Sequence, residues 1–235
     1  MKLLRANFVI GLALFSALAW SQDSFDFQIS SVAILQSKKV QKELGISESL
    51  RANMNKTADS FNAKTASLNA KAQKVKSQAE AEKLSKEMDS ILDEFRTKIL
   101  KMLSSAQLKR LREITMQQLG YSALGESAVA KKIGIRSEQL GRIRSTLDSA
   151  FKQADDLSRK EMEAATKDLR DKKPKTDAEK KKLAVEFEKR VSAVQKKIEP
   201  KLNSIRQQTE KKLLSLLSDS QQKAWSGLKG KPFTI

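Results

Sequence analysis

The sequence predicts an all-α protein built from two tandem units of long antiparallel helical hairpins with short capping helices, the second hairpin being extended. Glycine and proline are scarce, with eight Gly and three Pro in 235 residues, and the dominant residues are good helix formers. Apolar residues recur three or four positions apart, as on one face of a helix. No run of alternating β-branched and aromatic residues suggests a strand.

The first half contains two apolar stripes that predict the first hairpin, with its tip between Gln73 and Gln78. The stripe before the tip comprises Leu50, Met54, Thr57, Phe61, Leu68, Ala72 and Val75. The stripe after it comprises Leu84, Met88, Ile91, Phe95, Ile99 and Met102.

The second half repeats this plan, and its tip is marked by helix-ending and helix-starting residues. Pro174 stops the incoming helix, and Thr176 with Glu179 forms a capping box for the outgoing one. Pro200 is expected to kink that outgoing helix. The two stripes comprise Leu140, Ile143, Leu147, Phe151, Ala154 and Leu157, then Phe187, Val191, Val194, Ile198, Leu202 and Ile205.

A five-residue pattern occurs four times. The copies are Ile46–Leu50, Leu103–Gln107, Ile135–Gln139 and Leu217–Gln221, of which the second and fourth read Leu-Ser-x-x-Gln. In these two, Ser104 with Gln107 and Ser218 with Gln221 predict capping boxes that start helices. The apolar Leu103 and Leu217 precede the caps.

The other two copies each follow a glycine that is expected to end a short helix in the left-handed conformation. After Gly45, Ser47 is expected to cap the next helix, although Leu50 replaces the glutamine. After Gly134, the copy keeps Ile135 and Gln139, but Arg136 replaces the serine. We therefore expect Ser137 to supply that cap.

Sequence offsets indicate a duplication. The segment from Val40 to Ile46 aligns with that from Val129 to Ile135, 89 residues later. The segment 98–104 aligns with 212–218, 114 residues later. The difference of 25 residues measures the extension of the second hairpin. We expect one unit over residues 22–120 and another over 121–235, unless the two form one continuous domain.

The N-terminus has the layout of a secretory signal peptide over residues 1–21. Lys2 and Arg5 precede an apolar run of about a dozen residues, too short to span a bilayer roughly 30 Å thick. Small residues allow cleavage after Ala19 or after Ser21. We expect a periplasmic or secreted protein that has no transmembrane span after cleavage.

The composition argues against catalysis. The chain has neither Cys nor His, which excludes disulfides, thiolate zinc sites and histidine-based triads. A Ser-Lys or carboxylate enzyme stays formally open, but no spacing suggests one. We expect no enzyme, no catalytic residue, no cofactor and no metal.

The net charge is +18 and falls to +16 once Lys2 and Arg5 are removed. For an exported chain this balance favours acidic client proteins, anionic envelope polymers or lipid head groups over nucleic acid. A well-solvated, lysine-rich helical surface is the alternative interpretation.

The repeated pattern resembles that of the periplasmic LTxxQ-motif family, the Spy/CpxP-like chaperones. The likeness is carried by Leu103-Ser104-x-x-Gln107, by Leu217-Ser218-x-x-Gln221 and by the copy that ends at Gln139, with Ser in place of the family's Thr. The resemblance implies a helical cradle that binds partly folded proteins without ATP and a stress response role in the envelope. Four copies in place of two suggest either a monomeric pseudo-dimer or a homodimer.

Two functions follow as hypotheses. The first is an ATP-independent chaperone that binds unfolded or partly folded proteins through a basic cradle. The second is a structural or adaptor protein whose hairpins pair, as in a coiled coil, with a partner helix or contact an anionic envelope polymer. Possible client contacts are Met54, Phe61, Met88, Phe95 and Phe151, although helical spacing favours the hairpin core as their place.

Overall fold

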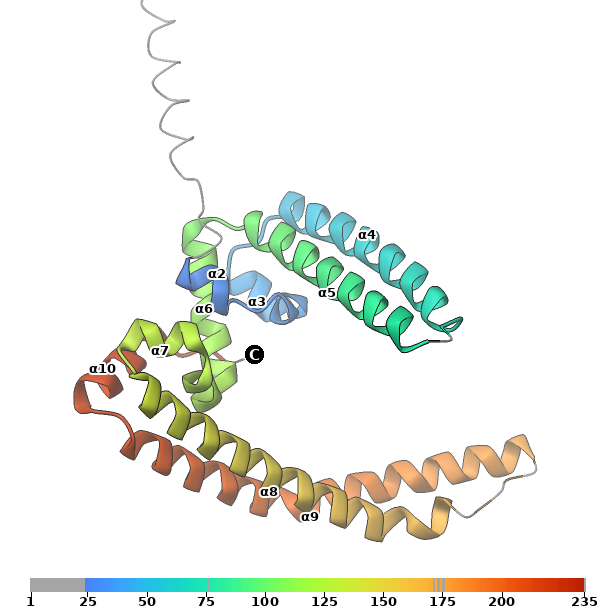
Figure 1. Ribbon diagram of the computed structural model, residues 1–235. Helices are drawn as coiled ribbons and strands as arrows, with labels where there is room; N and C mark the ends of the chain where they lie inside the picture. Colours follow the sequence, from blue (N-terminus) through green and yellow to red (C-terminus); the bar gives the residue numbers. More distant parts are fainter. Residues whose placement is uncertain (1–23, 76, 171, 173, 175, 235) are drawn as a thin grey trace, which may run out of the picture. The chain divides into compact units, whose positions relative to one another are not determined.

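The computed structural model describes residues 24–75, 77–170, 172, 174 and 176–234. The predicted signal peptide, residues 1–21, lies outside this part of the chain. Within it, the secondary structure consists of α-helices and two short 3₁₀ helices with no strand, so the prediction of an all-α fold is confirmed (Figure 1).

The chain divides into two compact units, which are described separately. The first extends to Leu119 and takes in the C-terminal segment from Leu228 onward, and the second is Gly120–Gly227. The sequence predicts that the C-terminal segment belongs to the second unit. The structure places it with the first, because its backbone is bound by side chains of that unit.

The first unit contains three short helical elements followed by three longer helices. In chain order they are α2 (Phe25–Ile29), η1 (Ala33–Gln36), α3 (Lys38–Glu43), α4 (Glu48–Ala72), α5 (Gln78–Lys101) and α6 (Ser105–Leu119). α4 and α5 pack side by side, and α2 packs on α6 (Figure 1). Helix α5 begins after Ser77, whose hydroxyl accepts a hydrogen bond from the backbone N–H of Glu80.

The core of the first unit lies around α6, which buries several of its side chains almost completely. Its buried members include Val40, Leu100, Leu103, Leu108, Leu111 and Ile114. The buried guanidinium of Arg112 binds the Asp26 carboxylate (2.9 Å) and the carbonyl oxygen of Leu228. Gln117 donates to the Lys229 carbonyl (2.6 Å) and accepts from the Phe233 N–H (2.8 Å). These bonds hold the C-terminal segment against α6.

The second unit contains a 3₁₀ helix, two short α-helices and two long ones. In chain order they are η2 (Gly120–Gly125), α7 (Ser127–Ile133), α8 (Ser137–Arg170), α9 (Asp177–Ser215) and α10 (Asp219–Leu228). α8 and α9 pack along each other. The side chains of Leu124, Val129, Ile143, Leu213 and Trp225 are buried near the end of this pair where α7 and α10 lie.

The signals at the tip of the α8–α9 pair act as the sequence indicates. The Thr176 hydroxyl accepts from the Glu179 N–H (3.2 Å), and the Glu179 carboxylate accepts from the Thr176 N–H (3.1 Å). Helix α9 continues through Pro200 and is bent in Figure 1. Proline explains a bend because it removes one backbone donor and its ring crowds the preceding turn.

The spacing of Phe151 predicts a place on the packed face of α8, but the residue is 72% exposed. Towards α9, helix α8 presents a stripe through Ile143, Thr146, Ala150 and Ala154. Successive residues of a helix are turned by about 100°. Phe151 therefore lies one step beyond the small Ala150 and points away from the seam.

Two glycines of the second unit offer a matched stability test. Gly134 ends α7 with φ +74°, a left-handed conformation, whereas Gly141 lies inside α8 with no heavy atom within 4 Å of an added Cβ. We predict that Gly134→Ala lowers the free energy of unfolding by about 1–2 kcal/mol. Gly141→Ala should raise it by about 0.5–1 kcal/mol. Urea titrations compare the two, and equal effects would contradict the assigned conformations.

Candidate functional site

Both clean copies of the repeated pattern form capping boxes in the structure. The backbone N–H of Ser104 donates to the Gln107 side-chain oxygen (2.9 Å), and the Gln107 N–H donates to the Ser104 hydroxyl (3.3 Å). Ser218 and Gln221 make the same two bonds at 3.0 and 3.3 Å. Leu103 before the first box is buried. These bonds satisfy N–H groups that the first turn of a helix leaves without partners.

The glutamine of each box has a second role that capping does not require. The side-chain amide of Gln107 donates to the carbonyl oxygens of Leu44 (3.0 Å) and Gly45 (3.5 Å). These carbonyls lie where α3 ends, at the first copy of the pattern. One side chain thus joins the start of α6 to the end of a helix about sixty residues earlier.

In the second unit this connection is reciprocal. The amide groups of Gln139 and Gln221 hydrogen-bond each other in both directions, at 2.7 and 3.1 Å. Gln139 also donates to the Leu216 carbonyl (2.5 Å), and Gln221 donates to the Gly134 carbonyl (2.8 Å). The starts of α8 and α10 are therefore tied to the ends of α9 and α7. We call this arrangement the glutamine bracket.

The first unit has half of this bracket, since Leu50 stands where the second glutamine would be. Ser47 still caps α4, its hydroxyl accepting from the Leu50 N–H (3.2 Å). In the third copy the expected cap from Ser137 is wrong. Ser137 is the first residue of α8, and Arg136 occupies the cap position. The Arg136 N–H donates instead to the Gln139 side-chain oxygen (3.4 Å).

The apolar pattern residues anchor these junctions. Ile135 and Leu217 are buried beside the bracket, as Leu103 is in the first unit. The structure thus places nine residues of the pattern at two helix junctions, namely Ser47, Leu103, Ser104, Gln107, Ile135, Gln139, Leu217, Ser218 and Gln221. None of them lines one of the grooves described next, which are separate features of the hairpins.

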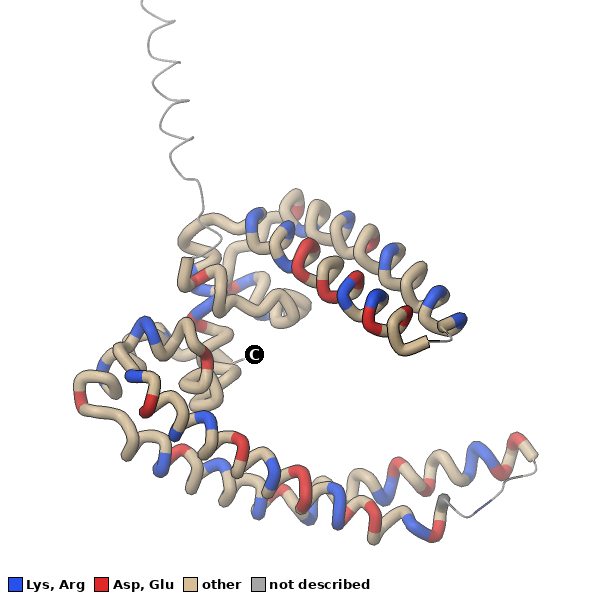
Figure 2. The backbone as a smooth tube through the Cα atoms, viewed as in Figure 1, with Lys and Arg blue, Asp and Glu red and all other residues tan. Residues whose placement is uncertain are grey.

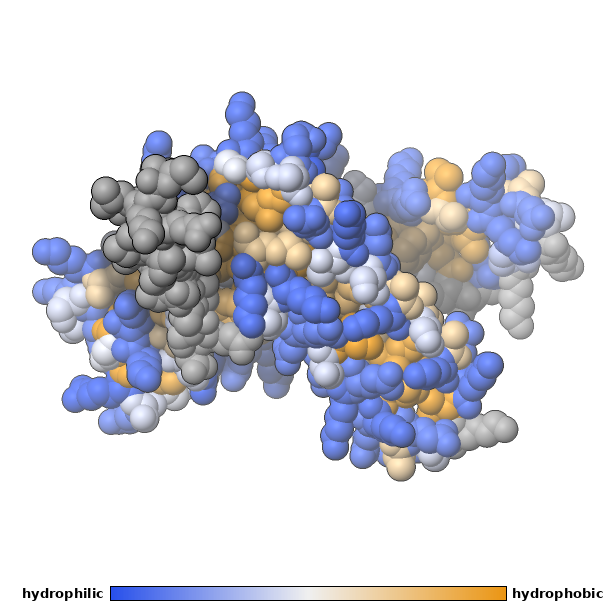
Figure 3. Space-filling view, turned by 90° about the horizontal axis from the view of Figure 1, so that it is seen from above, coloured by the Kyte–Doolittle hydropathy of each residue, from blue (hydrophilic) through white to orange (hydrophobic). Residues whose placement is uncertain are grey.

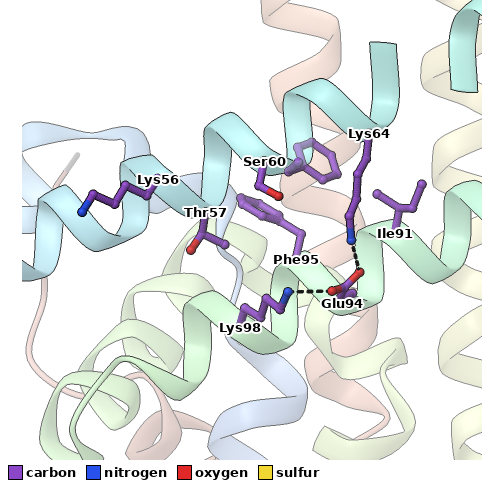
Figure 4. A pocket seen from close by; sticks show the side chains of 9 residues that line it. Lys56, Thr57, Ser60, Lys64, Ile91, Glu94, Phe95 and Lys98 are labelled. Atoms are coloured by element: carbon purple, nitrogen blue, oxygen red, sulfur yellow. Dashed lines mark hydrogen bonds and ion pairs between the residues drawn. The ribbon is translucent and has the colours of Figure 1, made fainter. Parts of the chain in front are cut away.

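The base of the α4–α5 pair contains a groove of about 170 Å³ floored by two phenylalanines (Figure 4). The rings of Phe61 and Phe95 stack with centroids 4.5 Å apart. Three lysines rim the groove, and two of them, Lys64 and Lys98, hold the Glu94 carboxylate from either side at 2.6 Å. Figure 4 shows this row of charges crossing the groove beside Ile91.

The outer end of each hairpin has a larger, open groove. That of the first unit measures about 300 Å³ and is lined by uncharged residues, namely Leu68, Asn69, Ala72, Val75, Ala81, Leu84, Ser85 and Met88. That of the second unit measures about 450 Å³ and is lined by Thr166, Leu169, Pro174, Lys180, Leu183, Ala184, Phe187 and Glu188. We call these the first and second tip grooves.

The five proposed client contacts lie in different settings. Met54 is 9% exposed and belongs to the core of the first unit, so it is not available to a client. Phe61 and Phe95 are half-buried in the basal groove, and Met88 is half-buried in the first tip groove. Phe151 is free on the surface of α8.

Sequence reasoning missed the apolar residues that are most exposed near the second tip. Val185 is 64% exposed and Phe187 is 45% exposed. The sequence analysis placed Phe187 on the packed face of α9. A usable signal was the run of three lysines, Lys180–Lys182, more than one turn before it. Three consecutive lysines cover several faces of the helix, so that only a narrow apolar stripe is left to pack against a partner.

Among the described residues, no group of three or more His, Cys, Asp or Glu side chains is placed to hold a metal ion. Over the same residues, none of the helices combines the length and apolar character needed to cross a bilayer. Comparison with known proteins found no matching family model, no matching curated protein and no matching solved structure.

The glutamine bracket predicts a strong coupling between its two members. Replacing Gln221 alone by Leu removes the hydrogen bonds that its side chain makes to the Gly134 carbonyl, the Ser218 N–H and the Gln139 amide, and should cost about 1–3 kcal/mol of unfolding free energy. The double replacement of Gln139 and Gln221 should cost at least about 0.5 kcal/mol less than the sum of the single effects. Chemical denaturation of the unchanged protein, the two single variants and the double variant measures this coupling, with the exposed Gln195→Leu as control. Additive effects would contradict a reciprocal pair.

The Glu94 carboxyl provides a test of the basal groove. Hydrogen bonds and charge from Lys64 and Lys98 lower its pKa from 4.5 to about 2. Because the folded pKa lies below the unfolded one, the interaction stabilises the fold above pH 4.5 and is lost as the pH falls towards 2. A carboxyl-detected NMR titration should show this midpoint. Replacing both lysines by Gln should return it towards 4.5, whereas Lys86→Gln should not.

Proposed function

We propose that this protein is an exported, ATP-independent chaperone-like protein that holds partly folded proteins on its basic helical hairpins. The observation that supports this most directly is the presence of open grooves with apolar lining on both hairpins, together with the exposed side chains of Phe151 and Phe187 on the second. In a soluble helical pair such residues ordinarily complete the seam between the helices. Here they stay accessible between charged neighbours, and Figure 3 shows apolar side chains at the surface as patches separated by hydrophilic ones.

The grooves suit reversible binding. They are shallow and open, so that a client segment buries only part of its surface and gains a modest free energy, at about 25 cal/mol per Å² of apolar area removed from water. Ordering a flexible segment offsets part of that gain. A client held in this way is released without an energy source such as ATP.

The charge of the helices supports attraction of acidic clients over a distance. Helix α9 has eleven Lys or Arg against six Asp or Glu, whereas α8 has seven of each. Figure 2 shows blue positions distributed along both hairpins. A surface of one net sign raises the association rate of oppositely charged partners and does so less at high salt.

The resemblance to the LTxxQ-motif family supports the same proposal from the residues of the pattern. It extends the proposal to the bacterial envelope, with residues 1–21 as a cleaved signal peptide. The two units, each with two copies of the pattern, are consistent with a pseudo-dimer in one chain. Mass measurement in solution distinguishes a monomer of this kind from a homodimer.

The test is suppression of client aggregation by the processed chain. At near-stoichiometric ratio it should delay light scattering from an acidic client that unfolds on reduction or heating, and high salt should weaken the effect. Phe151→Ser should raise the protein concentration required for the same suppression about two- to fivefold, because it removes an exposed aromatic contact worth up to ~1 kcal/mol. Gln153→Ser, two residues away on the same helix, is the matched control.

The adaptor interpretation gives the opposite result in the same assay. A structural protein of the envelope would leave client aggregation unchanged and would sediment with envelope material or with one defined partner. Absence of suppression at any ratio, together with such sedimentation, would favour that function. Equal loss of suppression in the Gln153→Ser control would show that Phe151 has no special role.

A further inference from the structure

We propose that the second tip groove selects acidic segments that contain apolar side chains, and that it is the charge-sensitive client site of the protein. This inference rests on the proposed chaperone function and names the kind of segment that one groove takes. It is drawn from the shape of the groove, from the pairing of the charges around it and from the contrast with the first tip groove.

The groove offers a ready apolar surface. Leu169 forms its floor and is 5% exposed, while Phe187 is open on its wall. Pro174, Leu183 and Ala184 also belong to the apolar lining. The volume of about 450 Å³ accommodates one or two apolar side chains of a bound segment. Val185, two positions before Phe187 on α9, is also exposed.

Most carboxylates around the groove are already occupied. Asp168 and Glu186 both bind the guanidinium of Arg190, the latter at 2.7 Å, and Arg190 lowers the pKa of each carboxyl. Asp177 binds Lys180 at 2.9 Å. Glu179 accepts from the backbone of Thr176 in the capping box. These contacts fix where the negative charges lie but do not remove them, so the positive field of the tip comes from the larger number of basic residues around it.

The lysines that remain give the tip its positive field. Lys181 and Lys182 lie in the first turns of α9, and Lys172 lies in the connection from α8, all three exposed. Over residues 166–190 the sequence has ten Lys or Arg against six Asp or Glu. Among the described residues that line the groove, Glu188 is the one carboxylate, and it opposes an acidic ligand. Its removal should therefore strengthen binding of that ligand.

The first tip groove provides an internal comparison. The described residues that line it are uncharged, and none of them is aromatic. Apolar segments of either charge should enter it about equally, whereas the second groove should favour acidic ones. The two hairpins would then hold different parts of the same unfolding protein.

A protein segment fits this groove better than an anionic membrane surface does. The apolar side chains line a concavity between α8 and α9, and Leu169 at its floor is buried. A flat bilayer contacts protruding apolar groups at a helix or loop surface. An extended or helical segment can instead insert side chains into the concavity while its carboxylates meet the surrounding lysines.

The experiment measures binding of three short labelled peptides to the processed chain by fluorescence anisotropy. The peptides share the same Leu and Phe positions and differ in having Glu, Gln or Lys between them. The Glu peptide should bind at least about tenfold more tightly than the Lys peptide at low ionic strength, with the difference shrinking at high salt. Equal affinity for the three peptides would overturn the proposal.

Variants locate the binding in the second tip groove. Phe187→Ser should lower the affinity for the Glu peptide about tenfold, and Glu188→Gln should raise that affinity about two- to threefold. Replacing Lys181 and Lys182 together by Gln should weaken it about three- to tenfold. The matched control is the same double change at Lys211 and Lys212, an exposed lysine pair further along α9. The proposal is wrong if both pairs act alike or if Glu188→Gln weakens binding.

Two further readouts separate this inference from the function on which it rests. If aggregation of a client is suppressed but the peptides show no charge preference, the chaperone proposal stands and the assigned groove is wrong. If neither is seen, both proposals fail. Vesicles of anionic lipid are added as a third probe, and binding of vesicles without binding of the Glu peptide would overturn the inference in favour of a membrane contact.

Discussion

The architecture depends on how the backbone groups at its helix junctions are satisfied. Each helix end leaves several N–H or C=O groups without intrahelical partners, and these units bring a helix start and a helix end together at every copy of the pattern. A glutamine amide has both a donor and an acceptor. Gln107 and Gln221 therefore cap their own helix and also bind the carbonyls at the end of another one. Serine alone can cap a helix, but its short side chain leaves the opposite carbonyl without a partner.

These braced junctions allow the hairpins to keep apolar groups accessible. The cores of the two units lie around α6 and around the packing of α7, α10 and the nearby ends of α8 and α9, where side chains such as Leu111 and Leu213 are fully buried. Further along, the seams bury fewer apolar side chains, such as Leu68 and Ile198, and also contain the Phe61–Phe95 stack and ion pairs such as Lys197–Glu161. Exposed pairs of this kind contribute little stability. The outer ends can therefore present grooves without weakening the junctions.

Local features of the fold were predictable from the sequence, and contacts between distant segments were not. The capping boxes at Ser104 and Thr176 follow from spacing over three residues, which sequence displays directly. The bracket between Gln139 and Gln221 joins residues 82 positions apart, and no periodicity reports such a pair. The same reason explains the C-terminal segment, whose Phe233 is bound by Gln117 of the first unit. Phe151 was misplaced because an apolar face of six residues does not reveal that Ala150, one step away, occupies the seam.

The extension of the second hairpin is where the two units differ most in the chemistry that they expose. The longer α8 and α9 add a lysine-rich tip with an aromatic side chain at its groove, while the first tip stays uncharged along its lining. The hydrogen bonds of the bracket lie at the base of the hairpin. A longer hairpin therefore leaves these bonds unchanged. The two units share a glutamine that ties helix ends together, in a complete bracket in the second unit and half of one in the first, and they differ in length and charge beyond it. Under the proposed chaperone function, arms that differ in this way would hold segments of differing charge.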